Sequence, residues 1–395
     1  MLIQITLVLF IGILAGTLTG LIPGIHINLI GVFLVSLSVS FLSQINSIYF
    51  CVFIVAMAIA HTFIDFIPSI FLGCPDTDTE LSILPGHELL KRGLGYEATI
   101  LTCYGSLAAI FILILIAFPS ILIISKIYES IRKLIPYFLI LISITLISLE
   151  RKKIKSLFVF LLTGILGYLI LNFPNLNQPL LPLLTGLFGS SMLVMSIKNK
   201  IQIPEQKITK PKITSIKPFL GSLIASPLCS FLPGLGAGQA AIIGSTIAKT
   251  DQRGFLILLG ATNTLVMGFS FISLYIISKT RTGAAVAVQE IIGKLETNIL
   301  ILLLGVILLS GIISFFLTKI LTQFFSQKIT KINYTTLSII ILLSLIIIIF
   351  LVSGFLGVLM LTISTLTGIY SISLKVRRTN MMGCLLIPTI ILYLI

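Results

Sequence analysis

Tryptophan is absent from this 395-residue sequence, and charged residues make up only 10% of it. Soluble domains carry about 25% charged residues, so the composition excludes an ordinary soluble protein. Asp, Glu, Lys and Arg are all missing from the sequence before Asp65. A cleaved signal peptide begins with a positively charged region, so we do not expect this apolar beginning to be one. Hydrophobic residues reach 57% of the chain, which predicts a protein embedded in a membrane.

Familiar catalytic and metal-binding motifs are also missing. The sequence has no H-E-x-x-H, G-x-S-x-G or P-loop pattern, and its five cysteines show no C-x-x-C spacing. We therefore expect no enzyme, no cofactor and no metal, and we interpret the cysteines as small apolar side chains. The net charge of +14 comes mainly from Lys and Arg in short loops between apolar runs. This placement is typical of membrane proteins, so a nucleic acid partner is not expected.

The apolar runs predict an all-α polytopic membrane protein with about 10–12 transmembrane or re-entrant helices, because a span needs about 20 apolar residues. A basic, proline-containing segment, 198–217, is interpreted as a cytoplasmic linker. It separates a first repeat, 1–197, from a second repeat, 218–395. We expect the protein to be a multi-pass component of the cell (plasma) membrane.

Two Pro-Gly pairs interrupt apolar runs in corresponding places of the two halves. They are Pro23-Gly24 and Pro233-Gly234. Proline removes a backbone donor and glycine adopts angles that other residues avoid, so we expect a helix break at each pair. Broken backbone at membrane depth is tolerated only where it is buried in protein or lines a wet cavity. Paired breaks of this kind point to the binding site of a transporter.

The spacing of the polar residues indicates an internal duplication. Pro23 and Pro233 are 210 residues apart, and a shift of 202 residues places His61-Thr62 on Asn263-Thr264. The same shift places His87 on Gln289. We interpret this register as two structural repeats, which we expect to be inverted relative to each other.

A helix that starts after a break directs its free N–H groups and positive dipole end into the break, where they favour an anion. We predict a substrate site formed by both breaks, by the polar tips that follow 72 and 277, and by nearby polar residues. Its members are Pro23, Gly24, His26, Asn28, Gly73, Pro75, Thr77, Pro233, Gly234, Gly236, Gly238, Gln239, Asn263, Lys279 and Arg281. The alternative is that the small residues serve helix packing and the tips are solvated loops.

Three acids are predicted to couple transport to Na⁺ or H⁺, because ionisable residues at membrane depth usually mark an ion pathway. They are Asp65, Asp76 and Asp78. His61 and Asp65 share a helix face, so they could relay a proton, hold a metal or simply form a buried hydrogen-bonded pair. One rival function is a membrane-embedded metalloenzyme using His61, Asp65 and His87. Another is a channel or exporter for a cationic solute, suggested by the acidic first tip.

Four motifs together resemble the large permease subunit of the tripartite tricarboxylate transporters, in its shorter archaeal form. They are Leu21-Ile22-Pro23-Gly24, Phe231-Leu232-Pro233-Gly234-Leu235-Gly236-Ala237, Leu72-Gly73-Cys74-Pro75 and the stretch 84–93. The resemblance covers most of the chain. It implies ion-driven uptake of a small carboxylate-bearing solute. It also implies two partners, a small membrane subunit and an extracellular solute-binding protein.

Overall fold

The computed structural model describes residues 2–22, 46–73, 79–148, 150–198, 203–211, 213, 215–231, 237–278, 280, 282–331, 333–376 and 378–394, and every regular element among them is helical. The elements of the first half are α1 (Leu2–Leu21), α3 (Ser47–Ile64), α4 (Phe66–Leu72), η1 (Glu80–Ser82), α5 (Ile83–Lys91), α6 (Gly95–Ser148), α7 (Lys153–Leu171), α8 (Leu180–Leu184), the π-helical turn η2 (Thr185–Ser190) and α9 (Ser191–Lys198).

The second half continues with the same kind of element. Its helices are α10 (Lys217–Phe231), α11 (Ala237–Ala248), α12 (Gln252–Ile277), α13 (Gly283–Ile292), α14 (Thr297–Lys328), η3 (Ile329–Lys331), α15 (Tyr334–Ser373), η4 (Arg378–Met382) and α16 (Gly383–Leu394). In the described part of the chain, seven helices are long and apolar enough to cross a membrane, and five shorter apolar helices accompany them. The expected all-α polytopic membrane protein is confirmed.

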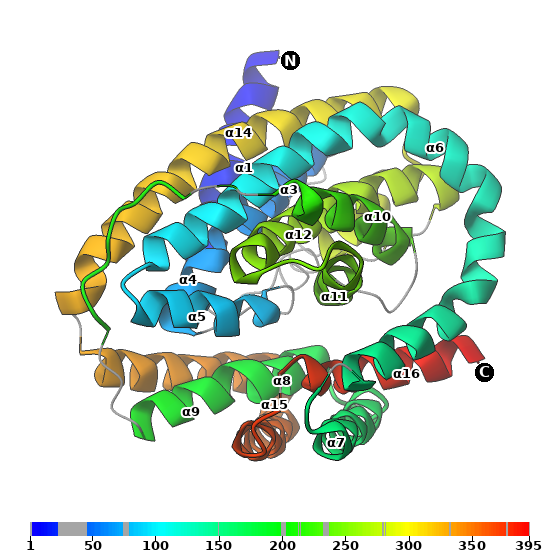
Figure 1. The fold of residues 1–395 in the computed structure, drawn as a ribbon. Coiled ribbons are helices and arrows are strands. Elements are labelled where there is room, and N and C mark those ends of the chain that lie inside the picture. Colours follow the sequence, from blue (N-terminus) through cyan, green and yellow to red (C-terminus); the bar gives the residue numbers. More distant parts are fainter. Residues whose placement is uncertain are drawn as a thin grey trace.

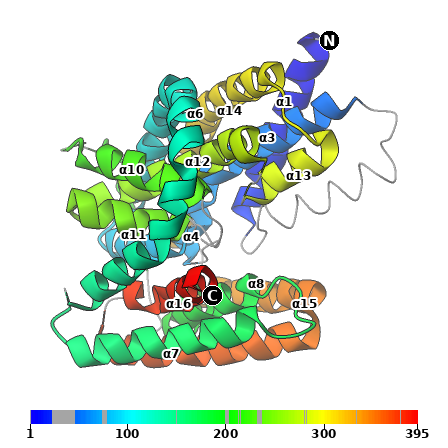
Figure 2. The ribbon, with the colours of Figure 1, turned by 90° about the vertical axis from the view of Figure 1, so that its right-hand side faces the viewer.

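The helices form a bundle and a layer beneath it. Figure 2 shows α1, α3 and α10–α14 in the bundle, and α7, α8, α15 and α16 in the layer. The long helix α6 starts in the bundle and curves down to the layer (Figure 1). It contains Pro119 and Pro136. Each proline removes an intrahelical hydrogen bond, which lets the helix bend between the two parts.

Two membrane spans form the centre of the bundle. The span Ser47–Leu72 is 89% buried and the span Gln252–Ile277 is 94% buried, whereas the other five are between 22% and 44% buried. Because lipid can cover an apolar surface as well as protein can, the five exposed spans are typical of helices at the membrane boundary. The two buried spans are shielded from lipid, so polar side chains can be placed on them.

Glycines allow neighbouring helices to approach closely. A Cβ atom on Gly105 of α6 would lie 2.0 Å from the Ile257 carbonyl oxygen, and one on Gly260 of α12 would lie 2.0 Å from the Thr102 carbonyl oxygen. The Ser106 hydroxyl donates a 3.0 Å hydrogen bond to the Gly260 carbonyl oxygen across the same contact. The backbones of α6 and α12 therefore touch directly, as small residues permit in membranes.

Helix boundaries recur at the shift seen in the sequence. The first residues of α6 and α14, Gly95 and Thr297, are related by that shift. In the second half, Gly354 takes backbone angles outside the helical region, φ 66° and ψ −164°, and divides α15. The equivalent position in the first half is Lys152, which directly precedes α7. This correspondence supports the duplication, while the inverted repeats stay a prediction.

The basic segment between the halves packs against the bundle. Helix α9 ends at Lys198 and α10 begins at Lys217. Between them, the Lys207 amide donates to the Gly93 carbonyl oxygen at 2.7 Å, and the Gly95 amide donates to Gln206 Oε1 at 2.8 Å. The linker therefore covers the turn between α5 and α6. The division into two domains on either side of it stays a prediction.

The contact between α6 and α12 supplies a first test. Gly260→Ala adds a methyl group where backbone already lies, so we expect a loss of about 1–3 kcal/mol of stability. Gly305 of α14 has no atom within 4 Å of its Cβ position, and Gly305→Ala is the matched control. The control is expected to be neutral or stabilising by up to about 1 kcal/mol, because alanine favours helix. Thermal unfolding in detergent measures both, and equal melting points for the two variants would contradict the close contact.

Candidate functional site

A buried polar seam joins the two central spans. The hydroxyl oxygens of Thr62 on α3 and Thr264 on α12 are 3.4 Å apart, and both residues are almost fully buried. These two residues are equivalent under the shift that relates the halves. Equivalent residues of two repeats can meet only near the axis that relates the repeats, so the seam lies at the centre of the proposed duplication.

Asp65 and Asn263 form the second contact of the seam. The Asn263 side-chain amide donates a hydrogen bond of 3.0 Å to Asp65 Oδ2, and both residues are 3% exposed. Asp65 lies at the interruption between α3 and α4. Pro68 follows three residues later and cannot donate to the Ile64 carbonyl, so the helix is interrupted at this point. The structure thus brings together two predicted site residues from opposite halves of the chain.

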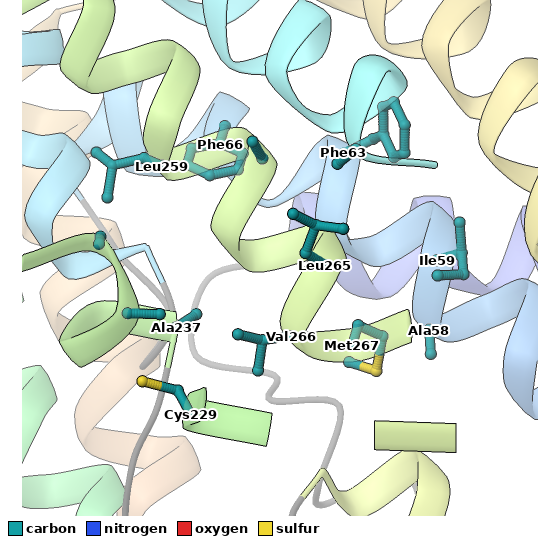
Figure 3. Packing of buried hydrophobic residues seen from close by; sticks show 14 of the residues in the cluster. Ala58, Ile59, Phe63, Phe66, Cys229, Ala237, Leu259, Leu265, Val266 and Met267 are labelled. Carbon is teal, nitrogen blue, oxygen red and sulfur yellow. The ribbon is translucent and has the colours of Figure 1, made fainter. Parts of the chain in front are cut away.

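Apolar side chains enclose the seam. Figure 3 shows part of the hydrophobic cluster formed by the helices that carry the seam and their neighbours α4, α10 and α11, including Ala58, Ile59, Phe63, Phe66, Cys229, Ala237, Leu265, Val266 and Met267. Cys51, Cys103, Cys229 and Cys384 are all buried, which agrees with their interpretation as small apolar side chains. Hydrogen bonds and charges are stronger in such low-dielectric surroundings than in water.

His61 is held by α1. Its Nδ1 atom lies 3.2 Å from the Thr19 hydroxyl oxygen, and the ring is 3% exposed. Small residues on α1 make this approach possible, because a Cβ atom on Gly16 would lie 2.3 Å from the Met57 carbonyl oxygen. His61 and Asp65 therefore contact different helices, α1 and α12, while they share one face of α3.

The two helices that precede the Pro-Gly pairs end against this seam. A Cβ atom on Gly20 near the end of α1 would lie 3.1 Å from Ile64 Cβ and 3.3 Å from the Asp65 amide nitrogen. Near the end of α10, the Ser230 hydroxyl donates to the Val266 carbonyl oxygen at 3.3 Å. Ile64 and Val266 are again equivalent under the shift that relates Thr62 to Thr264. The helices that precede the two Pro-Gly pairs therefore both end at the same central region.

Helix α11 begins at Ala237, after the second Pro-Gly pair. Its first turn carries two predicted site residues. Gly238 and Gln239 are both buried, with Gln239 2% exposed. Several other predicted site residues lie outside the residues that the structure describes. They are Pro23, Gly24, His26, Asn28, Pro75, Asp76, Thr77, Asp78, Pro233, Gly234, Gly236, Lys279 and Arg281.

Paired hydroxyl groups hold the chain at each polar tip. Ser69 and Thr79 have hydroxyl oxygens 2.6 Å apart, and those of Ser270 and Thr282 are also 2.6 Å apart. Sequence reasoning missed these four residues. The signal was a near-repeat, since the shift from Ser69 to Ser270 is one shorter, and the shift from Thr79 to Thr282 one longer, than the shift from Thr62 to Thr264. A comparison at the single shift that relates Thr62 to Thr264 does not align these residues with each other.

His87 belongs to the first tip and is separate from the seam. Its Nδ1 atom lies 3.0 Å from the Ile70 carbonyl oxygen, and its ring packs against Gly73, which ends α4 with a left-handed φ of 67°. Within the described ranges, no three His, Cys, Asp or Glu side chains are grouped as a metal would require. His61, Asp65 and His87 therefore do not form the ligand set of the metalloenzyme hypothesis.

Comparison with known proteins adds the decisive observation. A family described as the tripartite tricarboxylate transporter TctA family matches residues 6–383. The chain belongs to this family. It is also similar to an uncharacterized protein of Methanocaldococcus jannaschii, with 32% identity over 400 residues that cover 98% of each chain. No solved structure matches the chain significantly.

Membership of the TctA family confirms the resemblance inferred from the sequence motifs. It makes the chain a multi-pass membrane permease of the tripartite tricarboxylate transporter class. The match spans both central helices, the buried seam and the two polar tips.

The buried histidine of the first tip supplies a second test. Burial, together with the positive charge of Lys91 and a smaller effect of Arg378, lowers the pKa of His87 from 6.5 to about 4. The unfolded state therefore binds more protons than the native state between these pH values. Stability is fully present above pH 6.5 and is lost as the pH falls towards 4, by roughly 3 kcal/mol in total.

We expect His87→Asn to remove this component, because asparagine does not titrate and its amide can still donate to Ile70. Melting points measured from pH 7.5 to 4 should fall more steeply in the unmodified protein than in the variant. Parallel pH profiles would show that the pKa of His87 is the same in the native and unfolded states.

Proposed function

We propose that the chain is an ion-coupled secondary transporter, a permease for a small carboxylate-bearing solute of tricarboxylate type. The proposal combines the family with the buried polar seam between α3 and α12. The solute would bind between the two Pro-Gly breaks, in the cell (plasma) membrane, and Na⁺ or H⁺ would serve as the coupling ion. No cofactor and no catalytic residue are part of this mechanism.

The observation that carries the proposal is the Asp65–Asn263 contact. A carboxyl group inside a span that is 89% buried is energetically expensive and is kept where it has a function. It lies at a helix interruption, where backbone carbonyls are available beside the side chain. Carboxylate, amide and carbonyl oxygens are suitable ligands for Na⁺, and the carboxylate alone can carry H⁺. We assign ion coupling to Asp65, with Asp76 and Asp78 as further candidates.

The location of α11 supports an anionic solute. Its first turn begins at Ala237, shortly after the second Pro-Gly pair, and is buried. The free N–H groups of a helix start attract a carboxylate without any cation. Gln239, Gly238 and the Pro-Gly backbone would bind one end of the solute, and Lys279 and Arg281 would pair with its carboxylates. His26, Asn28 and the first break would supply the matching donors from the other half.

The family also suggests two partners. We propose that a small membrane subunit and an extracellular solute-binding protein assemble with this permease, as in the tripartite class. The exposed apolar spans of the chain are compatible with a membrane-embedded partner as well as with lipid. Co-purification with the products of co-expressed candidate subunits tests this part separately from transport.

The role of Asp65 can be separated from solute binding. Asp65→Asn removes the charge but keeps an oxygen that accepts from Asn263, so the packing should survive. We expect accumulation driven by a Na⁺ or H⁺ gradient to fall at least tenfold, while exchange of labelled for unlabelled citrate continues. Uptake into proteoliposomes with imposed gradients measures both activities.

Glu290→Gln is the matched control, because Glu290 is an exposed acid on α13. The control should accumulate solute as the unmodified protein does. Gradient-driven accumulation that is intact in Asp65→Asn would remove Asp65 from the coupling mechanism. Loss of exchange as well as accumulation would instead place it in solute binding.

A further inference from the structure

A partly buried arginine lies in the layer beneath the bundle. Arg378 begins η4, and its Nη1 atom is fully buried without a hydrogen-bond partner. Its Nη2 atom contacts the sulfur of Met192 on α9. Arg378 takes part in no ion pair within the described part of the chain; the ion pair found there joins Arg253 to Glu97.

This environment leaves part of the guanidinium without a good acceptor. A guanidinium has five N–H donors and is charged at physiological pH, and a thioether sulfur is only a weak acceptor. Burial lowers the pKa of Arg378 from 12.5 to about 10, which still leaves the group charged at neutral pH. A buried charge is normally paired, because its lost hydration must be replaced. Among the described residues, the buried Nη1 atom of Arg378 therefore has no anionic partner.

The neighbouring groups do not supply that anion. Asn380, two residues further on, donates to Glu150 Oε1 at 3.4 Å and accepts a 2.8 Å hydrogen bond from Ser156. That carboxylate is directed to the Asn380 amide. On the bundle side, the positive charge of Arg378 reaches His87 of α5, whose low pKa keeps its ring neutral at pH 7. Lys91 adds a further positive charge to the same region.

We propose that Arg378 forms a binding site for a carboxylate group of the transported solute, at the junction between α5 of the bundle and η4 and α9 of the layer. A guanidinium binds a carboxylate through two parallel hydrogen bonds, and the unpartnered Nη1 atom supplies one of them. The site is distinct from the seam between α3 and α12. It rests on the proposed function in one respect only, namely that the anion is a carboxylate solute.

The experiment uses the full chain purified in detergent and compares thermal stability with citrate, succinate and inorganic phosphate as probes. A ligand that binds only the native state raises the melting point. The variants are Arg378→Gln, which removes the charge, and Arg378→Lys, which keeps the charge but loses the planar fork. Lys375→Gln is the control, since Lys375 is an exposed cation three residues away.

We expect citrate to raise the melting point of the unmodified protein and of Lys375→Gln by equal amounts. Arg378→Gln should bind citrate at least tenfold more weakly, and Arg378→Lys should lie between the two. Without ligand, Arg378→Gln should melt at the same temperature as the unmodified protein or higher, because a buried unpaired charge has been removed. A purely structural arginine would instead lower that melting point and leave the citrate effect unchanged.

Other outcomes separate this inference from the proposed function. If citrate stabilises the unmodified protein and Arg378→Gln equally, the Arg378 site is refuted and carboxylate transport stands. If only phosphate acts, and acts through Arg378, the anion site stands and the carboxylate substrate falls. Repeating the assay in nanodiscs with and without phosphatidylglycerol covers the lipid source. An Arg378-dependent effect of the anionic lipid alone, or no anion effect at all, refutes the solute site.

Discussion

The structure depends on the pairing of polar groups at the centre of an apolar bundle. Asp65 and Asn263 lie on spans shielded from both water and lipid, where an unsatisfied amide or carboxyl group is costly. Their hydrogen bond, with the Thr62–Thr264 contact beside it, sets the position of α3 against α12. The ends of α1 and α10 pack against the same region. The helices that lead to the two Pro-Gly pairs therefore end beside spans whose mutual position is already determined.

Small residues make this arrangement possible. The hydrophobic effect does not drive helices together within lipid, because lipid chains are as apolar as the helices. Van der Waals contacts at close backbone approach therefore provide the packing energy. Gly16 lets α1 reach α3, and Gly105 and Gly260 let α6 reach α12. The long helix α6, bent at its prolines, then connects the bundle to the layer (Figure 1). The layer carries Arg378 and α5 carries Lys91, and both positive charges act on His87. The region beside the first tip is therefore positively charged. Transport in this architecture would involve both parts.

Parts of the site could be predicted from the sequence, and the reasons differ from residue to residue. Asp65 and Asn263 stood out because polar residues are rare in apolar spans, and the seam joins them. Ser69 and Thr79 were missed, since small hydroxyl residues are common in membrane helices and the contact between these two depends on the tertiary structure. Arg378 was missed because basic residues between apolar runs usually face water, and only the burial of its Nη1 atom distinguishes it from the exposed Lys375.

The sequence by itself determined that the chain is a helical membrane protein, because apolar length and charge scarcity act locally along the backbone, and it predicted two corresponding halves from the paired Pro-Gly motifs. It also indicated which residue types are too polar for lipid. Only the tertiary structure decided which of them meet. His61 contacts Thr19, and among the described residues it belongs to no group of side chains that could hold a metal. Asp65 contacts Asn263 in the opposite half of the chain. Such contacts depend on the close approach of helices from different parts of the chain, and no local pattern specifies that approach.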